Sequence, residues 1–364
     1  MAGSTYGTIF KITTWGESHG TGVGVIIDGC PAGLLLCEED IQKFLDRRKP
    51  GQSKYSTPRK EEDAVEILSG VFEGKTTGTP ISLAVFNRNQ RSKDYSEIAS
   101  YYRPGHADYT FDMKYGFRDY RGGGRSSGRE TIGRVAAGAV AVKILNQLGI
   151  TLTSYTSSIG PVKIQNFDPA QIGQNPLYMP DTEAAQNAQA YLDACMADHD
   201  SSGGVVECIV HGMPAGIGDP VFEKLNANLA KAILSIGAVK GFEIGDGFQA
   251  ARATGKSNND AFRLSPEGTV EKASNHAGGI LGGMSDGSDI LLRAAFKPTP
   301  SIASPQQTVT RSGEEIEVSI KGRHDPIIVP RAVVVVESMT AITIVDALFA
   351  NMSARMDSLE RFYR

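Results

Sequence analysis

Apolar residues recur at helical spacing in four stretches of the chain. The predicted helices span residues 38–48, 131–148, 184–197 and 221–234, and the third has the weakest pattern. In the first, Ile41, Phe44 and Leu45 share one face, and Pro50-Gly51 follows as a stop signal. The second is rich in Ala and Val and ends before Gly149, a typical C-terminal cap. Its small residues predict close packing against a neighbouring sheet or helix.

Short β-branched runs bounded by turn residues predict strands. These runs cover residues 23–28, 81–86, 205–210 and 290–296, and residues 331–351 combine strand and helix signals. Residues 87–129 have no regular pattern, and so long an irregular stretch is typical of a functional or disordered segment. Residues 257–275 are polar, and we expect them to be disordered until ligands bind.

Two similar seven-residue turns occur far apart in the chain. Residues 27–33 read IDGCPAG and residues 210–216 read VHGMPAG, and each follows a strand and precedes a helix. A shared turn preference would explain this, and so would duplication of a strand–turn–helix unit. Because no linker-like segment separates the halves, we favour duplication within one domain spanning residues 1–364. The pseudo-repeated halves would cover roughly residues 1–150 and 200–350.

Composition and charge exclude several classes of protein. The 364 residues carry a formal net charge of −4, so no overall basic field attracts nucleic acid or anionic membrane. The four cysteines show neither C-x-x-C spacing nor a nearby histidine cluster, which favours reduced, buried thiols over a metal site or a disulfide framework. Residues 1–14 lack the apolar core of a signal peptide, and we expect no membrane span. These features predict a cytoplasmic protein.

A glycine- and arginine-rich segment directly precedes the strongest predicted helix. Residues 121–131 read RGGGRSSGRET. Glycines allow close backbone approach to a ligand, amides at a helix start carry partial positive charge, and guanidinium groups bind oxyanions. The segment therefore indicates an anion site, although a mobile surface turn or an RGG-type RNA contact would have the same composition. It is not a P-loop, because G-x-x-x-x-G-K-[ST] is absent.

Other segments are candidates for anion binding or proton transfer. Residues 47–60 contain six basic residues and no acid, which fits either a solvated surface or one side of a positive cleft. His19 and His106 each lie in a glycine-containing turn, so they are candidates for proton transfer as well as for structural roles. In the carboxyl half, residues 278–283, 297–301 and 322–326 suit phosphate or flavin contacts. No G-x-G-x-x-G follows a strand, and GESHG at residues 16–20 is not a serine nucleophile elbow.

Five of these motifs together resemble the chorismate synthase family. They are GESHG at 16–20, RPGHAD at 103–108, RGGGRSSGRET at 121–131, SNHAGG at 274–279 and GRHDP at 322–326. They occur in the family's order over nearly the whole chain. The resemblance implies an α/β (α+β) sandwich with sheets flanked by helices, assembled as a homotetramer. The implied reaction is the 1,4-anti elimination of phosphate from 5-enolpyruvylshikimate 3-phosphate to give chorismate, with reduced FMN and no net redox change.

The resemblance also implies roles for individual residues. Protons would come from His19 and His106, and Asp346 would act with the flavin to remove a hydrogen. Flavin contacts would come from Arg125, Ser126, Ser127, Gly237, Ala238, Gly282, Lys297, Pro298, Thr299, Pro300, Ser301 and Arg323. The substrate or NADPH would contact Arg48, Lys54 and Arg134. Position 54 often holds arginine in the family, and this chain has lysine there. Lysine lacks the fork of N–H donors with which arginine makes a bidentate contact.

The charge of the implied ligands agrees with the basic segments. The substrate carries about −4 from one phosphate and two carboxylates, and FMN adds a second phosphate. A net-acidic protein can hold both only by concentrating Arg and Lys in one cleft. No reductase module is apparent, so we expect an external flavin reductase, with NADPH as an indirect reductant. Two alternatives remain. One is an RNA-binding module that uses residues 121–129. The other is a nucleotide-dependent phosphotransferase, and it is disfavoured because this chain has neither a Walker lysine nor a Mg²⁺-binding Asp pair beside the glycine-rich segment.

Overall fold

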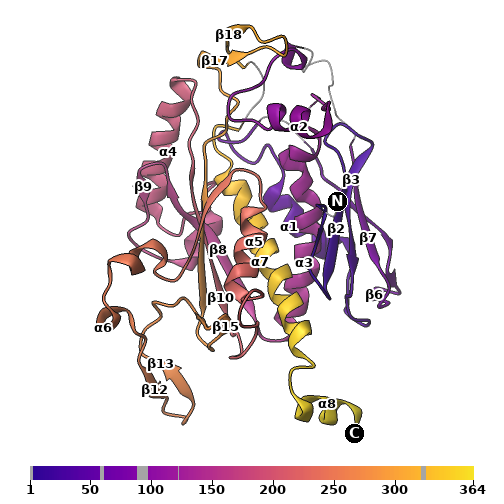
Figure 1. Ribbon diagram of the computed structural model, residues 1–364, viewed down its shortest axis with the longest axis vertical. Coiled ribbons are helices and arrows are strands. Elements are labelled where there is room, and N and C mark those ends of the chain that lie inside the picture. The colour runs from indigo at the N-terminus through magenta and orange to yellow at the C-terminus, as the bar shows by residue number, and fades with distance from the viewer. Residues whose placement is uncertain (1–2, 58–60, 88–96, 122, 321–324) are drawn as a thin grey trace.

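The computed structural model describes residues 3–57, 61–87, 97–121, 123–320 and 325–364, and it contains two antiparallel five-stranded sheets (Figure 1). The first sheet has the order β1 (Thr5–Tyr6), β2 (Lys11–Gly16), β3 (Gly22–Asp28), β7 (Ile81–Phe86) and β4 (Val65–Ser69). The second has the order β11 (Val239–Ile244), β16 (Ile290–Phe296), β10 (Gly204–His211), β8 (Thr151–Ile159) and β9 (Val162–Lys163).

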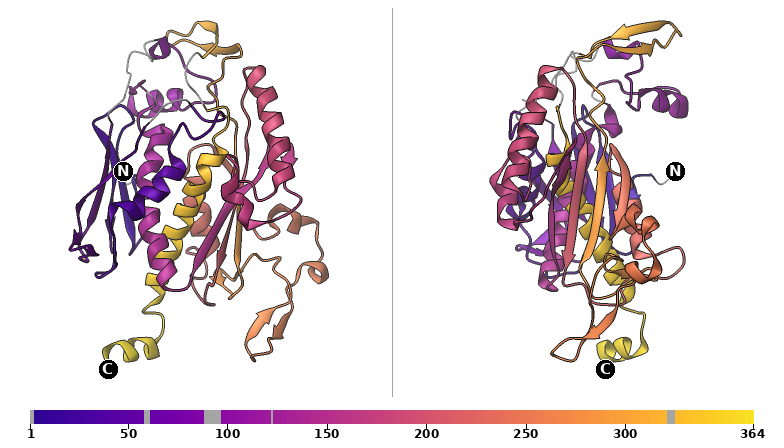
Figure 2. Two further views of the ribbon diagram at one scale, coloured as in Figure 1. Left: turned by 180° about the vertical axis from the view of Figure 1, so that it is seen from behind. Right: turned by 90° about the vertical axis from the view of Figure 1, so that its left-hand side faces the viewer.

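Four helices form a layer between the two sheets (Figures 1 and 2). They are α1 (Glu38–Arg48), α3 (Thr131–Gln147), α5 (Leu225–Leu234) and α7 (Val329–Asn351). α3 packs on β2, β3 and β7, α7 packs on β8 and β10, and the two helices pack against each other. The mixed helix-and-sheet class is confirmed, but these helices lie between the sheets rather than flanking them from outside. α4 (Thr182–Ala197) packs against β9 at the other side of the second sheet.

Close packing of α3 is confirmed at its small residues. Ala136, Ala137, Gly138 and Ala141 are buried, and a Cβ atom added at Gly138 would lie 2.1 Å from the Cβ of Ser338 on α7. α7 is long and apolar enough to cross a bilayer, but 78% of its most apolar 18-residue stretch is buried inside the protein. It is therefore the central core helix of this fold.

Most predicted elements are confirmed, and two are wrong in part. Residues 331–351 are one continuous helix without a strand, because burial on all sides outweighs the strand preference of Val333–Val336. The helix predicted from residue 221 begins at Leu225, since Val221 has a φ of 65° that no helix contains. The sequence pattern did not indicate β8, whose Thr- and Ser-rich strand lacks a regular apolar alternation.

The stretch without a pattern, residues 87–129, has local structure in its described parts. α2 (Asp108–Tyr115) and short 3₁₀ turns occur there, and Ile98 and Tyr101 pack against the hairpin of β17 (Gln306–Val309) and β18 (Glu315–Val318). Together these segments form a small lobe at one end of the helix layer (Figure 1). Polar hydrogen bonds replace a large apolar core in this lobe, which explains why its order was not predicted.

Disorder in residues 257–275 was also predicted, and the structure corrects this. β12 (Phe262–Leu264) and β13 (Val270–Lys272) form a hairpin. Asp260 accepts hydrogen bonds from the backbone amides of His276 and Ala277 and from Ser274 Oγ. The buried carboxylate therefore orders the base of a polar segment that the composition alone did not reveal. The remaining short elements are β5 (Val71–Phe72), β6 (Lys75–Thr76), α6 (Gly255–Asn258), β14 (Ile280–Leu281), β15 (Met284–Ser285) and α8 (Met356–Tyr363).

Candidate active site

A cavity of about 1260 Å³ lies between segments from both halves of the chain. Its wall includes the loop and 3₁₀ turns before α3, residues 235–240 around the start of β11, residues 296–300 after β16, and the first turns of α7. Sites for a single small molecule usually measure roughly 300–1,000 Å³. The cavity therefore has room for two ligands side by side.

The wall of this cavity carries excess positive charge. Eight Lys or Arg residues line it against four carboxylates, although the whole chain is net negative. The cations are Arg48, Lys114, Arg118, Arg125, Arg134, Lys240, Lys297 and Arg331, and the acids are Glu17, Asp119, Glu130 and Asp325. Burial, together with nearby Lys240, lowers the pKa of Lys297. Such a wall attracts ligands that carry several negative charges.

The glycine- and arginine-rich segment forms one side of the cavity. Gly123 and Gly124 have φ values of 81° and 52°, a conformation that favours glycine, and Ser126 Oγ donates to the Gly123 carbonyl at 2.7 Å. The Arg125 guanidinium donates to the carbonyls of Thr14 and Gly16 at 3.1 and 3.0 Å. Arg125 therefore docks the segment on the end of β2 while Ser126 and Ser127 line the cavity.

The described arginines of this segment do not form a free surface patch. Arg121 is paired with Asp119 at 2.8 Å, and Arg129 donates to Asp63 at 3.1 Å. Because these guanidinium groups are engaged within the protein, the geometry favours a ligand cavity over an exposed RNA contact. Gly122 lies outside the described residues.

His106 lies in the wall of the cavity and is held by a buried carboxylate. Its Nδ1 is 2.9 Å from Asp108 Oδ1, and a Cβ added at Gly123 would lie 3.3 Å from its Nε2. Asp108 also accepts from Arg103 Nε and Nη2 at 2.7 and 2.8 Å. Burial acts to raise the pKa of Asp108, but the hydrogen bonds from Arg103 and His106 outweigh it and hold that pKa well below its usual range. The ring is thus oriented through Nδ1, with Nε2 on the side of the glycine segment.

The other predicted proton donor, His19, is buried beside the cavity rather than in its wall. It is 8% exposed, and it lies close enough to Asp119 to add to the effect of Arg121, whose hydrogen bond lowers the pKa of that carboxyl group. Asn87 Nδ2 donates to the carbonyls of Glu17 and Gly20 at 3.1 and 2.9 Å, which fixes the loop that carries His19. Glu17 of the same loop lines the cavity.

Asp346 is not part of the cavity wall, and its catalytic role stays a prediction. Its carboxylate accepts from the backbone amides of Thr8, Ile9 and Phe10 at 2.8, 2.7 and 2.9 Å. It follows Val335, the last cavity residue on α7, by eleven positions, about 16 Å along a helix. Asp325, one of the four carboxylates that do line the cavity, accepts from the Thr57 amide and from Arg331 at 2.7 Å each.

This placement makes a prediction for Asp346→Ala. The variant should lose about 2 kcal/mol of unfolding free energy, because three amides lose a charged acceptor, and it should keep kcat within about threefold of the parent. Chemical denaturation and steady-state turnover measure both quantities. A large fall in kcat without loss of stability would contradict this prediction and support the catalytic role expected from the sequence.

The structure brings some predicted flavin contacts together and leaves others apart. Gly237, Ala238, Lys297, Thr299 and Pro300 line the cavity. Pro298 and Ser301 belong to the same segment after β16 but are not part of the wall, and neither is Gly282, which lies in the β14–β15 turn. Arg323 is outside the described residues, as are Gly322 and His324.

Two of these residues have unusual local features. The Thr299 hydroxyl is buried and has no hydrogen-bond partner among the described residues. Ala238 has a φ of 70°, an uncommon conformation for a residue with a side chain. Buried hydroxyls are nearly always hydrogen-bonded, and the Thr299 hydroxyl is available to a polar group of a ligand or to a water at this wall.

Of the residues predicted to contact the substrate or NADPH, some line the cavity and one does not. Arg48 and Arg134 line the cavity, and Arg134 donates to Glu130 and to Ser235 at 2.8 and 2.6 Å. Lys54 points elsewhere: it is largely exposed and paired with Asp193 at 2.8 Å. Arg331 was missed from the sequence, because no motif marks it and only the fold brings the start of α7 to the cavity.

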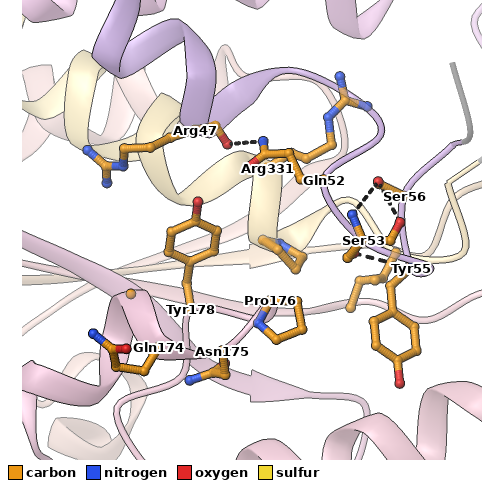
Figure 3. Close-up of a pocket in the computed structure, with 13 residues that line it drawn as sticks. Arg47, Gln52, Ser53, Tyr55, Ser56, Gln174, Asn175, Pro176, Tyr178 and Arg331 are labelled. Carbon is orange, nitrogen blue, oxygen red and sulfur yellow. Dashed lines mark hydrogen bonds between the residues drawn. The ribbon is translucent and has the colours of Figure 1, made fainter. Parts of the chain in front are cut away.

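A smaller cavity of about 290 Å³ adjoins the first through Arg331, which lines both. Figure 3 shows Arg47, Gln52 and Ser53 on one side and Pro176 and Tyr178 on the other. Arg47 is already paired with both oxygens of Glu337, at 3.0 and 2.6 Å. The basic run at 47–60 therefore divides: Arg48 faces the large cavity, Arg47 the small one, and Arg59 and Lys60 lie outside the described residues.

Comparison with known proteins gives one consistent result. The family model described as chorismate synthase matches residues 10–349. The chorismate synthases of Agathobacter rectalis and Lachnospira eligens are 72% and 69% identical to this chain, each over 100% of both chains. A crystal structure of chorismate synthase superposes with a TM-score of 0.77 at 32% identity, covering 98% of this chain and 96% of that one. The chain therefore belongs to the chorismate synthase family.

Proposed function

We propose that the large cavity holds FMN and 5-enolpyruvylshikimate 3-phosphate together. The family's reaction, which this chain catalyses, is the anti-1,4-elimination of phosphate from that substrate to give chorismate, and the family uses reduced flavin. The volume for two ligands and the excess of cations in the wall support the proposal. The single observation that carries it is the Thr299 hydroxyl, which has no partner among the described residues and lies in the segment 297–301 that is predicted to contact flavin.

In this proposal the residues of the chain supply binding, charge and protons. Bound reduced flavin would supply electron density to the substrate carbon from which phosphate departs, and it would take up the hydrogen that the elimination removes. His106 donates a proton from Nε2 to the leaving phosphate, while the contact between Nδ1 and Asp108 keeps the ring oriented. Arg48 and Arg134 stabilise the charge that develops on the departing group. His19, which is held beside the cavity, supplies a proton to the reduced flavin.

The remaining expectations complete the proposal. The chain acts in the cytoplasm as a homotetramer, and an external reductase supplies reduced FMN at the expense of NADPH. Gly282 is predicted to contact flavin but is not part of this cavity wall. In a homotetramer, Gly282 would have to reach the flavin through the assembly of subunits. Analytical ultracentrifugation with and without FMN measures the subunit count directly.

The activity test is anaerobic. The protein is mixed with FMN and the phosphorylated substrate, and phosphate release is followed before and after photoreduction of the flavin. We expect release only with reduced flavin, and no net flavin oxidation when substrate is consumed. Equal release without reductant would contradict the role of the flavin, and salt-sensitive RNA binding without turnover would favour the nucleic-acid alternative.

We also propose that the two halves of the single domain repeat one duplicated unit. After β3, Thr76 Oγ1 donates to the Pro31 carbonyl and accepts from the Leu34 amide. After β10, Ser285 Oγ donates to the Pro214 carbonyl and accepts from the Ile217 amide in the same pattern. In each half a short hairpin follows the helix and leads into the next sheet strand, and a long core helix comes later. This common order supports duplication over a chance similarity of turns.

The depressed pKa of Asp108 predicts a pH dependence of stability. A carboxyl group whose folded pKa lies below its unfolded value, near 3.9, stabilises the fold fully above that value. The contribution is lost as pH falls below about 4 and approaches the folded pKa. Asp108→Asn should therefore be less stable than the parent at pH 7, and the difference should shrink in acid. Denaturation at several pH values checks this, and a difference independent of pH would contradict it.

A further inference from the structure

Arg48 reaches the cavity from the end of α1 with few partners of its own. Its side chain is 2% exposed, its Nη2 donates to Asp63 Oδ2 at 2.5 Å, and its Nη1 donates to the Gly128 carbonyl at 3.3 Å. The Nε atom is buried and has no hydrogen-bond partner in the part of the chain that the structure describes. Asp63 is thus the carboxylate that fixes this guanidinium group beside the cavity.

Asp63 holds a second arginine at the same time. Its Oδ1 accepts from Arg129 Nη1 at 3.1 Å, and Arg129 is also paired with Glu61. Arg129 follows Gly128 directly, so one carboxylate ties both Arg48 and the segment that lines the cavity wall. The carboxylate itself is 1% exposed and is not part of that wall.

The backbone around Asp63 is held in an unusual conformation. Its φ is 46°, in the left-handed region that few residues other than Gly, Asn and Asp adopt. Gln42 of α1 clamps this turn, because its Nε2 donates to the Asp63 carbonyl at 3.3 Å and its Oε1 accepts from the Val65 amide at 3.1 Å. α1 therefore supplies both Arg48 and the residue that brings Asp63 onto it. Strained backbone of this kind persists where its surroundings impose a particular geometry.

We propose that Asp63 is a positioning residue for the substrate site: it sets Arg48 to bind an anionic group of the phosphorylated substrate. Without the carboxylate, Arg48 would be a buried charge lacking its counterion, and it would leave this conformation. The inference rests on the proposed contact between Arg48 and the substrate.

The test uses the full-length protein with Asp63→Asn and Asp63→Gly. Both residues tolerate the positive φ, so the variants keep the backbone and lose the charge. We expect KM for the phosphorylated substrate to rise about tenfold, while kcat stays within about threefold. Substrate titration into protein with oxidised FMN, which does not turn over, should show the same tenfold loss, and the Kd for FMN should not change. Asp181→Asn, which removes another buried carboxylate that is not part of the cavity wall, should leave KM unchanged.

A double-mutant cycle separates positioning from a merely structural role. Arg48→Ala should raise KM about thirtyfold or more, and adding Asp63→Asn to it should raise KM no further, because Asp63 acts through Arg48. If Asp63→Asn raises KM equally with and without Arg48, or leaves KM unchanged in either folded variant, the inference is overturned. If Arg48→Ala itself leaves KM unchanged, the proposed substrate contact of Arg48 fails instead.

Discussion

Replacing His106 with alanine should lower kcat by about a hundredfold or more, the usual scale for losing a general acid, while FMN binding is retained. The imidazole is held through Nδ1 by Asp108, and its Nε2 lies beside Gly123 in the wall of the large cavity. Removing the ring takes away the proton that the departing phosphate needs but leaves the glycine segment and the strand end at Thr299 in place. Stopped-flow turnover with reduced FMN, together with a flavin titration, measures the two effects separately.

The matched control is His211→Ala. His211 Nδ1 is 2.8 Å from Asp289 Oδ2, so it forms the same kind of His–Asp pair, but it is not part of the cavity wall. Its loss should leave kcat within about threefold of the parent. Near-parental turnover of His106→Ala would remove His106 from the mechanism, and loss of FMN binding in that variant would show a role in holding the cavity instead.

The sequence predicted the helices and core strands because their periodicity reflects burial. Residues 38–48 became α1 with both bounds unchanged, since Ile41 and Leu45 are fully buried and the neighbouring positions are not. The prediction failed where tertiary context opposes local preference. Val333–Val336 prefer strands, yet they lie in a helix surrounded by protein, and no single-sequence pattern reports which surfaces will cover a segment.

The candidate site was predictable as far as motifs mark it. Arg125, Ser126 and His106 stand in glycine-containing motifs, and they do line the cavity. Arg331 and Asp63 carry no local signal, because their positions depend on how α7 and the turn at Asp63 pack against α1. The contacts of Asp346 carry no local signal either: an aspartate on a long helix can face any side of it, and only the fold shows that this one holds the turn at residues 8–10.

α3 and α7 cross and so join the two halves of the chain, and we expect Gly138→Ala to disrupt the packing at this crossing. In an isolated helix the change would stabilise by about 1 kcal/mol. Here the new Cβ would lie 2.1 Å from Ser338 Cβ and 2.6 Å from Ser338 Cα, and the second of these is a backbone atom that cannot rotate away. Overpacking against a backbone forces the helices apart, so we expect a net loss of about 3 kcal/mol in unfolding free energy, measured by urea denaturation.

Gly255→Ala is the control, because it is also a helical glycine but has no atom within 4 Å of an added Cβ. It should be neutral or slightly stabilising. Adding Ser338→Gly to Gly138→Ala removes the clash with the serine side chain but leaves the clash with the backbone at position 338, so it should recover part of the loss and not all of it. Full stability of Gly138→Ala alone would mean that the two helices separate at little cost, and the buried crossing would then not be what holds the halves together.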